Sequence, residues 1–207
     1  MEFLNRTIRL IILGFCFVLT SQAQTFEQTQ KALKQSYSNE YRGDYATAIA
    51  DIQKIYKADS YELNLRMGWL HYSQKKYPQS LEYYQKAIDL RKYSVEARLG
   101  YVGSANANKA YDKAYAKYEE ILTIDPYNSV ANYWVGVNYY KVKKYDIAAK
   151  YFELVVNMYP FDYDANHMLG WTYLSLGRIG EARHLFTVAL MNKPDDASAK
   201  EGLLKCK

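Results

Sequence analysis

The chain is poor in the residues that break regular structure and in those that cross-link it. Its 207 residues include only 10 Gly, 4 Pro and 2 Cys. So few glycines and prolines argue against a collagen-like, low-complexity or turn-rich all-β chain, and two cysteines exclude a disulfide-dense scaffold. The net charge is only +5 and no block of basic residues forms, so the sequence predicts no nucleic-acid partner. What the chain has in excess is tyrosine, with 23 residues.

Residues 1–23 have the pattern of a secretory signal peptide. Two arginines precede an apolar run over residues 10–19, and the small residues Ser21 and Ala23 stand where a signal peptidase requires them. The run is shorter than the about 20 apolar residues of a membrane span. We therefore expect cleavage after Ala23 and export to the periplasm or cell envelope of a Gram-negative bacterium. The alternative is an uncleaved anchor, which would give the protein its only membrane contact.

Cleavage would leave a single cysteine, Cys206, near the carboxy terminus. The mature charge would be +4, because the segment removes one Glu and two Arg. One cysteine cannot form an internal disulfide, so stability must come from packing. We interpret Cys206 as an incidental residue of a terminal cap, with a redox-active or intermolecular thiol as the alternative.

The sequence repeats with a period of 34 residues. In most units one position is glycine, an aromatic opens the second half, and a second aromatic follows within that half, while Val102 and Ile179 depart from this pattern. Examples are Gly68, Val102, Gly136 and Gly170, then Tyr77, Tyr111, Tyr145 and Ile179, then Tyr84, Tyr118, Phe152 and Phe186. Each unit holds two amphipathic stretches of about 13 residues with helical spacing. The period predicts helix pairs that bury their apolar faces by stacking on one another.

The order of these residues resembles the tetratricopeptide repeat, or TPR. The unit at 129–162 carries the pattern most fully, with Gly136, Tyr145, Ala148 and Pro160. The resemblance implies an all-α fold, a right-handed α-solenoid of about five TPR helix pairs with a C-terminal capping helix. A TPR domain is predicted over 24–207, with repeats at 29–60, 61–94, 95–128, 129–162 and 163–196 and the cap at 197–207.

In the TPR family the inner faces of the first helices form a concave groove. The matching positions here are rich in large aromatic residues that the repeat pattern does not require. We expect them to hold a partner segment, because aromatic side chains are common interface anchors and line peptide grooves. The alternative is that some of them pack between neighbouring helices. The predicted groove residues are Tyr37, Trp69, Tyr72, Asn106, Tyr133, Tyr140, His167 and Trp171.

The sequence shows no catalytic or metal-binding pattern. Its three histidines, His71, His167 and His184, lie far apart, and it has neither a Gly-rich phosphate loop nor a Gly-x-Ser-x-Gly elbow. We therefore expect no catalytic residues, no cofactor and no metal, and a non-enzymatic scaffold or adaptor that binds another protein or a peptide segment. The alternative is a carbohydrate- or peptidoglycan-binding envelope protein, because aromatic rings also stack on sugars.

Overall fold

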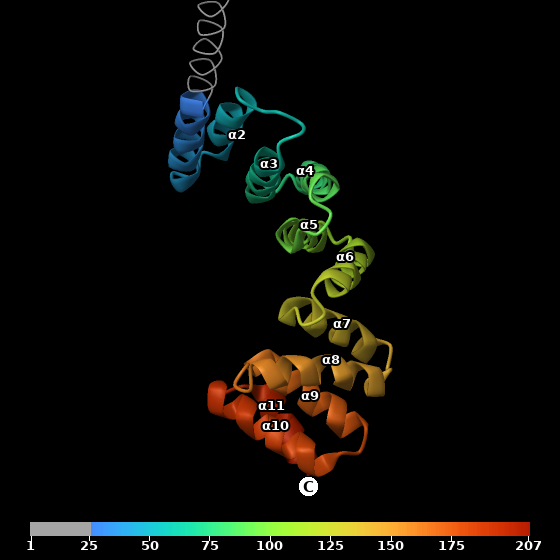
Figure 1. Ribbon diagram of the computed structural model, residues 1–207. Helices are drawn as coiled ribbons and strands as arrows, with labels where there is room; N and C mark the ends of the chain where they lie inside the picture. The colour runs from blue at the N-terminus through green and yellow to red at the C-terminus, as the bar shows by residue number, and fades with distance from the viewer. Residues whose placement is uncertain (1–25) are drawn as a thin grey trace, which may run out of the picture. The chain divides into compact units, whose positions relative to one another are not determined.

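The structure, a computed structural model, describes residues 26–207 (Figure 1). Within that range every regular element is a helix, which confirms the predicted all-α class. The predicted signal peptide, residues 1–23, lies outside the described residues. The chain divides between Lys92 and Tyr93 into two compact units.

The first unit contains four helices in the described part of the chain. The first occupies residues 26–41, and α2 (Tyr45–Gln53), α3 (Tyr61–Ser73) and α4 (Tyr77–Leu90) follow it. Helices α2 and α3 share an apolar core. Its buried members are Ala48, Ile49, Ile52, Leu63, Met67 and Leu70.

The second unit contains seven helices. They are α5 (Val95–Ala107), α6 (Tyr111–Ile124), α7 (Ser129–Lys141), α8 (Tyr145–Met158), α9 (Tyr163–Ser175), α10 (Ile179–Asn192) and α11 (Ala197–Lys205). Successive helices of this unit pack against one another, as the stacking of helix pairs requires. The largest fully buried side chains are Phe152 on α8 and Phe186 on α10.

The odd-numbered helices from α3 to α11 begin at side-chain caps that recur every 34 residues. The caps of α3, α5, α7, α9 and α11 each accept a hydrogen bond from the backbone N–H three residues on, which satisfies one of the unpaired donors of the first turn. These residues are Ser60, Ser94, Asn128, Asp162 and Asp196. The caps fix where each first helix starts and therefore which face it turns toward its neighbours.

The turns within the helix pairs all use a left-handed backbone residue. Glycine occupies that position at Gly43 and Gly177, and lysine occupies it at Lys75, Lys109 and Lys143, with φ between 58° and 77°. A left-handed residue just after a helix is a common way to end it. The lysines adopt this conformation at some steric cost, because L side chains disfavour positive φ.

Small residues on the first helices lie against aromatic rings of the second helices. A Cβ added at Gly136 would approach the Phe152 ring to 2.8 Å, and one added at Gly170 would approach the Phe186 ring to 3.0 Å. Both rings are fully buried. The recurring glycine and the recurring aromatic of the 34-residue period are therefore two sides of one packing contact.

The terminal helix α11 covers the end of the second unit. Gly202 on α11 lies directly against the Phe186 ring, closer than any Cβ would permit. Cys206 follows this helix and is fully buried in the same cluster as Phe186, where burial raises the pKa of its thiol. The thiol is therefore shielded and protonated at neutral pH, as in a cysteine that serves as a small apolar side chain.

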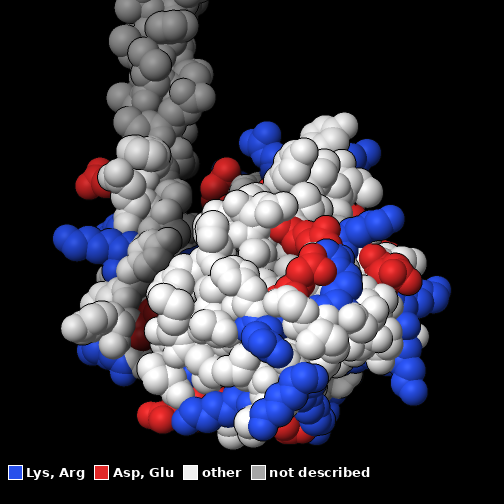
Figure 2. Space-filling model, turned by 90° about the horizontal axis from the view of Figure 1, so that it is seen from below, with Lys and Arg blue, Asp and Glu red and all other residues white. Residues whose placement is uncertain are grey.

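The described surface carries charges of both signs. On the face in Figure 2, Lys and Arg side chains lie among Asp and Glu side chains, with uncharged areas between them. Because both signs are mixed on this face, any preference for a charged ligand must arise from a local arrangement of side chains on one part of the surface.

None of the helices within residues 26–207 has the length and apolar character needed to cross a membrane.

Candidate functional site

The eight predicted groove residues fall on both units. Tyr37, Trp69 and Tyr72 belong to the first unit, and the other five belong to the second. None of the eight is fully buried. Each group therefore has its environment within its own unit.

In the first unit, Trp69 is held by a charged network that joins α3 to the helix at residues 26–41. The Glu40 carboxylate forms an ion pair with Arg66 and accepts a hydrogen bond from the Trp69 indole N–H. The Arg66 guanidinium also lies 3.9 Å from the centre of the Tyr37 ring. The Tyr72 ring lies 5.8 Å from that of Trp69, and both side chains remain partly exposed. This network fixes the position of the indole nitrogen, while the Trp69 side chain stays 45% exposed.

In the second unit, one cavity of about 330 Å³ lies between α6 and α7 and reaches the end of α5. Asn106 lines it and is hydrogen-bonded to the Tyr118 hydroxyl. The other lining residues are mostly aromatic or polar. They are Tyr111, Ala114, Tyr115, Tyr118, Trp134, Val137, Asn138 and Lys141.

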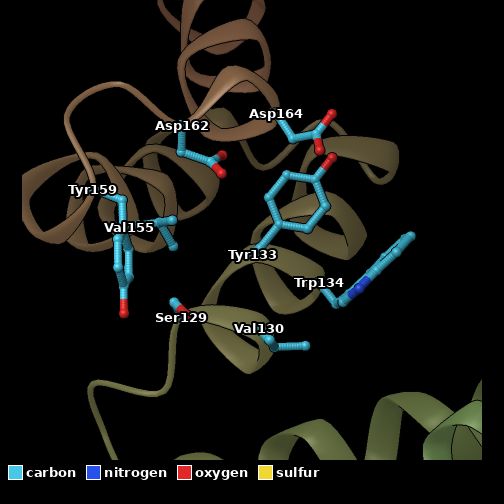
Figure 3. A pocket seen from close by; sticks show the side chains of 8 residues that line it. All are labelled: Ser129, Val130, Tyr133, Trp134, Val155, Tyr159, Asp162 and Asp164. Carbon is cyan, nitrogen blue, oxygen red and sulfur yellow. The ribbon is translucent and has the colours of Figure 1, made fainter.

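A second cavity of about 380 Å³ lies where α7 meets the end of α8 and the start of α9 (Figure 3). Tyr133 lies within it, with Trp134 to one side and Tyr159 to the other, and the Tyr133 hydroxyl points toward the Asp164 carboxylate. Burial raises the pKa of Tyr133 to about 12, and the negative charges of Asp164 and Asp162 add to the rise. The remaining lining residues are Ser129, Val130 and Val155.

Trp134 lines both cavities, and the sequence analysis did not predict it. Its side chain is 43% exposed, its ring stacks on Tyr118 at 6.3 Å, and it meets Tyr133 edge to face at 5.3 Å. It stands one residue beyond Tyr133, outside the groove positions known for the family. The only sequence signal was an unexplained tryptophan on a first helix.

Tyr140 lies apart from both cavities. Its ring packs edge to face on Tyr145 at 5.3 Å, and its hydroxyl is hydrogen-bonded to Ser175. Burial raises its pKa. Tyr140 therefore joins α7 to α8 and α9, while one part of its side chain stays exposed.

His167 and Trp171 contact the terminal helix α11. The Trp171 indole N–H lies 3.1 Å from the Ser198 hydroxyl, and His167 Nε2 lies 2.8 Å from the same oxygen. The Trp171 ring also packs edge to face on Phe186 at 5.2 Å. These contacts engage the Trp171 indole N–H and one ring nitrogen of His167 within the chain, and both side chains stay partly exposed.

The buried histidines predict a pH-dependent stability. Burial lowers the pKa of both His71 and His167 from the ordinary 6.5; for His167, Asp196 and Asp164 oppose the shift and Lys193 adds to it. Histidines of this kind stabilise the fold while neutral, so their contribution is complete above pH 6.5 and is lost as the pH falls. We expect the free energy of unfolding, measured by urea titration, to decrease from about pH 7.5 to about pH 5.5.

Single substitutions identify the histidines responsible. His167→Gln should reduce the pH dependence of the unfolding free energy, because the titrating group is removed while a polar side chain remains. His71→Gln should reduce the pH dependence for the same reason, since burial also lowers the pKa of His71. Equal slopes in the parent and in the His167→Gln variant would contradict the assignment.

Within residues 26–207, no three His, Cys, Asp or Glu side chains come close enough together to hold a metal ion. The two cavities of the second unit offer apolar contact, ring stacking and hydrogen bonding. Charge is supplied by Lys141 in one cavity and by Asp162 and Asp164 in the other.

Comparison with known proteins identifies the repeat. The tetratricopeptide repeat family model matches residues 33–95, 65–129 and 136–201. A search of curated proteins gives no match.

Several solved structures share the fold. A tetratricopeptide repeat protein from Parabacteroides merdae matches with a TM-score of 0.72 and 18% identity, over 87% of this chain and 72% of that chain. A MamA protein matches with a TM-score of 0.67 and 21% identity, over 83% and 94%. MamA from Desulfovibrio magneticus matches with a TM-score of 0.67 and 16% identity, over 82% and 97%. These matches confirm the predicted fold class, an α-solenoid of TPR helix pairs.

Proposed function

The chain belongs to the tetratricopeptide repeat family, and on that basis we propose that it is a non-enzymatic scaffold that binds a segment of another protein on its second unit. Stacked helix pairs of this kind offer extended concave surfaces, which proteins of the family typically use to bind protein partners. The proposal places the partner segment along α7, across the two cavities described above.

The observation that carries the proposal is that two cavities share one half-exposed tryptophan. Trp134 forms a wall of each, so a segment that crosses it contacts both. The cavities extend along α7 from Ser129 to Lys141, which is about 18 Å at the helical rise of 1.5 Å per residue. An extended segment of about five residues has that length. Partly exposed aromatic side chains in such a position have little rotamer freedom to lose on binding, as at interface hot spots.

The proposal includes export to the periplasm or the cell envelope. Its support is the pattern of residues 1–23, two arginines followed by a short apolar run and a small-residue cleavage site. Amino-terminal sequencing of the chain recovered from the periplasm of the producing cells should begin at Gln24. A chain that still starts at Met1 in the membrane fraction would show that the segment is an anchor.

Replacing Trp134 with alanine should abolish most of the partner affinity. Truncation of a central interface tryptophan costs about 2 kcal/mol or more, which is about a 30-fold rise in Kd. Peptides selected from a random displayed library against the purified chain provide the ligands, and calorimetry on the parent and the Trp134→Ala variant gives the two Kd values. Circular dichroism should show unchanged helix content in the variant.

The control variant is Tyr127→Ala, which removes an aromatic side chain that is 66% exposed and lines neither cavity. It should bind the selected peptides as the parent does. If Trp134→Ala binds as tightly as Tyr127→Ala, the interface lies elsewhere. If peptidoglycan fragments, and no peptides, bind in a manner that depends on Trp134, the carbohydrate-binding alternative replaces the scaffold.

A further inference from the structure

The cavity at the start of α9 combines aromatic rings with negative charge. Tyr133, Trp134 and Tyr159 contribute rings, while Asp162 and Asp164 contribute carboxylates (Figure 3). Its lining residues, all within the described second unit, include no Lys or Arg. The whole chain is mildly basic, so this negative cavity is a local feature that the net charge does not explain.

The two carboxylates have different structural roles. Asp162 caps α9 and accepts a hydrogen bond of 2.8 Å from the backbone N–H of Ala165. Asp164 is the second residue of α9 and is exposed, and the Tyr133 hydroxyl points toward it. The start of a helix favours nearby carboxylates and balances part of their charge. The capping hydrogen bond explains the position of one Asp162 oxygen, but it does not explain why a second carboxylate, that of Asp164, lies beside the same cavity.

The next repeat shows what occupies the equivalent place. Thirty-four residues after Tyr159 stands Lys193, and its ammonium lies 3.5 Å from the centre of the Tyr163 ring. Asp196 is the equivalent of Asp162; it caps α11 and is hydrogen-bonded to the Tyr163 hydroxyl. There the chain supplies its own cation to an aromatic ring beside a carboxylate. At the Asp162 cavity Tyr159 stands in place of Lys193 and Ser129 stands in place of Tyr163, so the chain supplies no cation there. The rings of that cavity come from Tyr133, Trp134 and Tyr159.

We propose that this cavity takes a Lys or Arg side chain of the partner segment, an inference that rests on the scaffold function proposed above. A cation between aromatic faces is attracted by their quadrupoles, and hydrogen bonds from it to carboxylates are among the stronger ones in proteins. An apolar side chain would remove water from Asp162 and Asp164 without replacing its hydrogen bonds, which is unfavourable. The cavity volume of about 380 Å³ lies within the range of ligand clefts, about 300–1,000 Å³.

A library selection tests the inference without assuming its answer. Random peptides are displayed and selected on the purified chain, on its Asp164→Asn variant and on its Trp134→Ala variant. Peptides selected on the parent chain should carry Lys or Arg at one shared position. The Asp164→Asn variant should lose that preference, and it should bind a selected basic peptide about tenfold more weakly, as expected from the loss of a hydrogen bond between charged groups.

The matched control is Asp146→Asn. Asp146 is the second residue of α8, as Asp164 is of α9, and it is exposed and lines neither cavity. Both substitutions remove the same helix-terminus charge, so only a specific contact can make their effects on binding differ. Replacing the peptide's basic residue with norleucine should weaken binding to the parent chain, and it should leave little further effect for Asp164→Asn.

The outcomes separate this inference from the proposed function. Peptides that bind in a Trp134-dependent manner but share no basic residue would overturn the cation site and leave the scaffold standing. Equal binding of basic peptides by the parent, Asp164→Asn and Asp146→Asn chains would overturn it as well. Selection of no Trp134-dependent peptide would contradict the proposed groove itself.

Discussion

Replacing Phe186 with alanine should lower the free energy of unfolding by about 3–5 kcal/mol, the usual cost of removing a buried phenylalanine ring. The ring is fully buried and lies between three elements. Gly170 of α9 and Gly202 of α11 approach it closely, and Trp171 packs on it edge to face at 5.2 Å. Because neither glycine has a side chain that could fill the space, the cavity left by the ring would collapse poorly.

The same substitution should loosen α11. This helix packs on α10, where Phe186 lies, and Gly202 is its closest approach to the ring. In repeat proteins a terminal element is held by its neighbour alone, so weakening that interface releases it first. Hydrogen exchange should show faster exchange in α11 of the Phe186→Ala variant than in α7, and urea titration followed by circular dichroism should give the loss of unfolding free energy.

The control is Met191→Ala on α10, the helix that carries Phe186. Met191 is 68% exposed, so its truncation should change the unfolding free energy by no more than about 0.5 kcal/mol. A Phe186→Ala variant as stable as Met191→Ala would mean that the ring is not the centre of the terminal core.

The helices could be predicted from the sequence because the information that sets them is local and repeated. A cap such as Asn128 lies next to the helix that it begins, and the spacing of Gly136 and Phe152 recurs as Gly170 and Phe186. Each of these signals acts within one repeat and its neighbour. The 34-residue period was therefore enough to predict the all-α class, the helix pairs, and the packing of small residues on large ones between them.

The candidate site was harder to predict, because it depends on which side chains of neighbouring helices lie over one another. A family position identifies the face of a helix, but it does not identify the neighbouring element that packs on that face. Trp171, for example, occupies a groove position and contacts Ser198 of α11. Trp134 lies one residue from a groove position and lines both cavities. The period also runs unbroken past Lys92, where the structure divides into two units.

The second large effect expected is on the first unit, where Glu40→Ala should lower the free energy of unfolding by about 3 kcal/mol. Removing one partner of a buried ion pair costs about 3–5 kcal/mol, since the remaining charge is left uncompensated. The Arg66 side chain is only 7% exposed and that of Glu40 is 21% exposed, which places the expected cost at the lower end of that range. Thermal or urea unfolding of the parent and variant chains measures it.

Two further variants decide whether the loss comes from the buried charge. Glu181→Ala removes one of two acidic partners of Arg178, in a pair whose side chains are 40% and 54% exposed, so it should cost much less stability than Glu40→Ala. Adding Arg66→Met to Glu40→Ala should recover part of the lost stability, because the double variant has no unpaired charge to bury. A double variant less stable than Glu40→Ala alone would contradict this explanation. It would mean that the Tyr37 ring and the Ser36 hydroxyl stabilise the Arg66 guanidinium without Glu40. The Glu40 carboxylate would then serve mainly to orient the Trp69 indole.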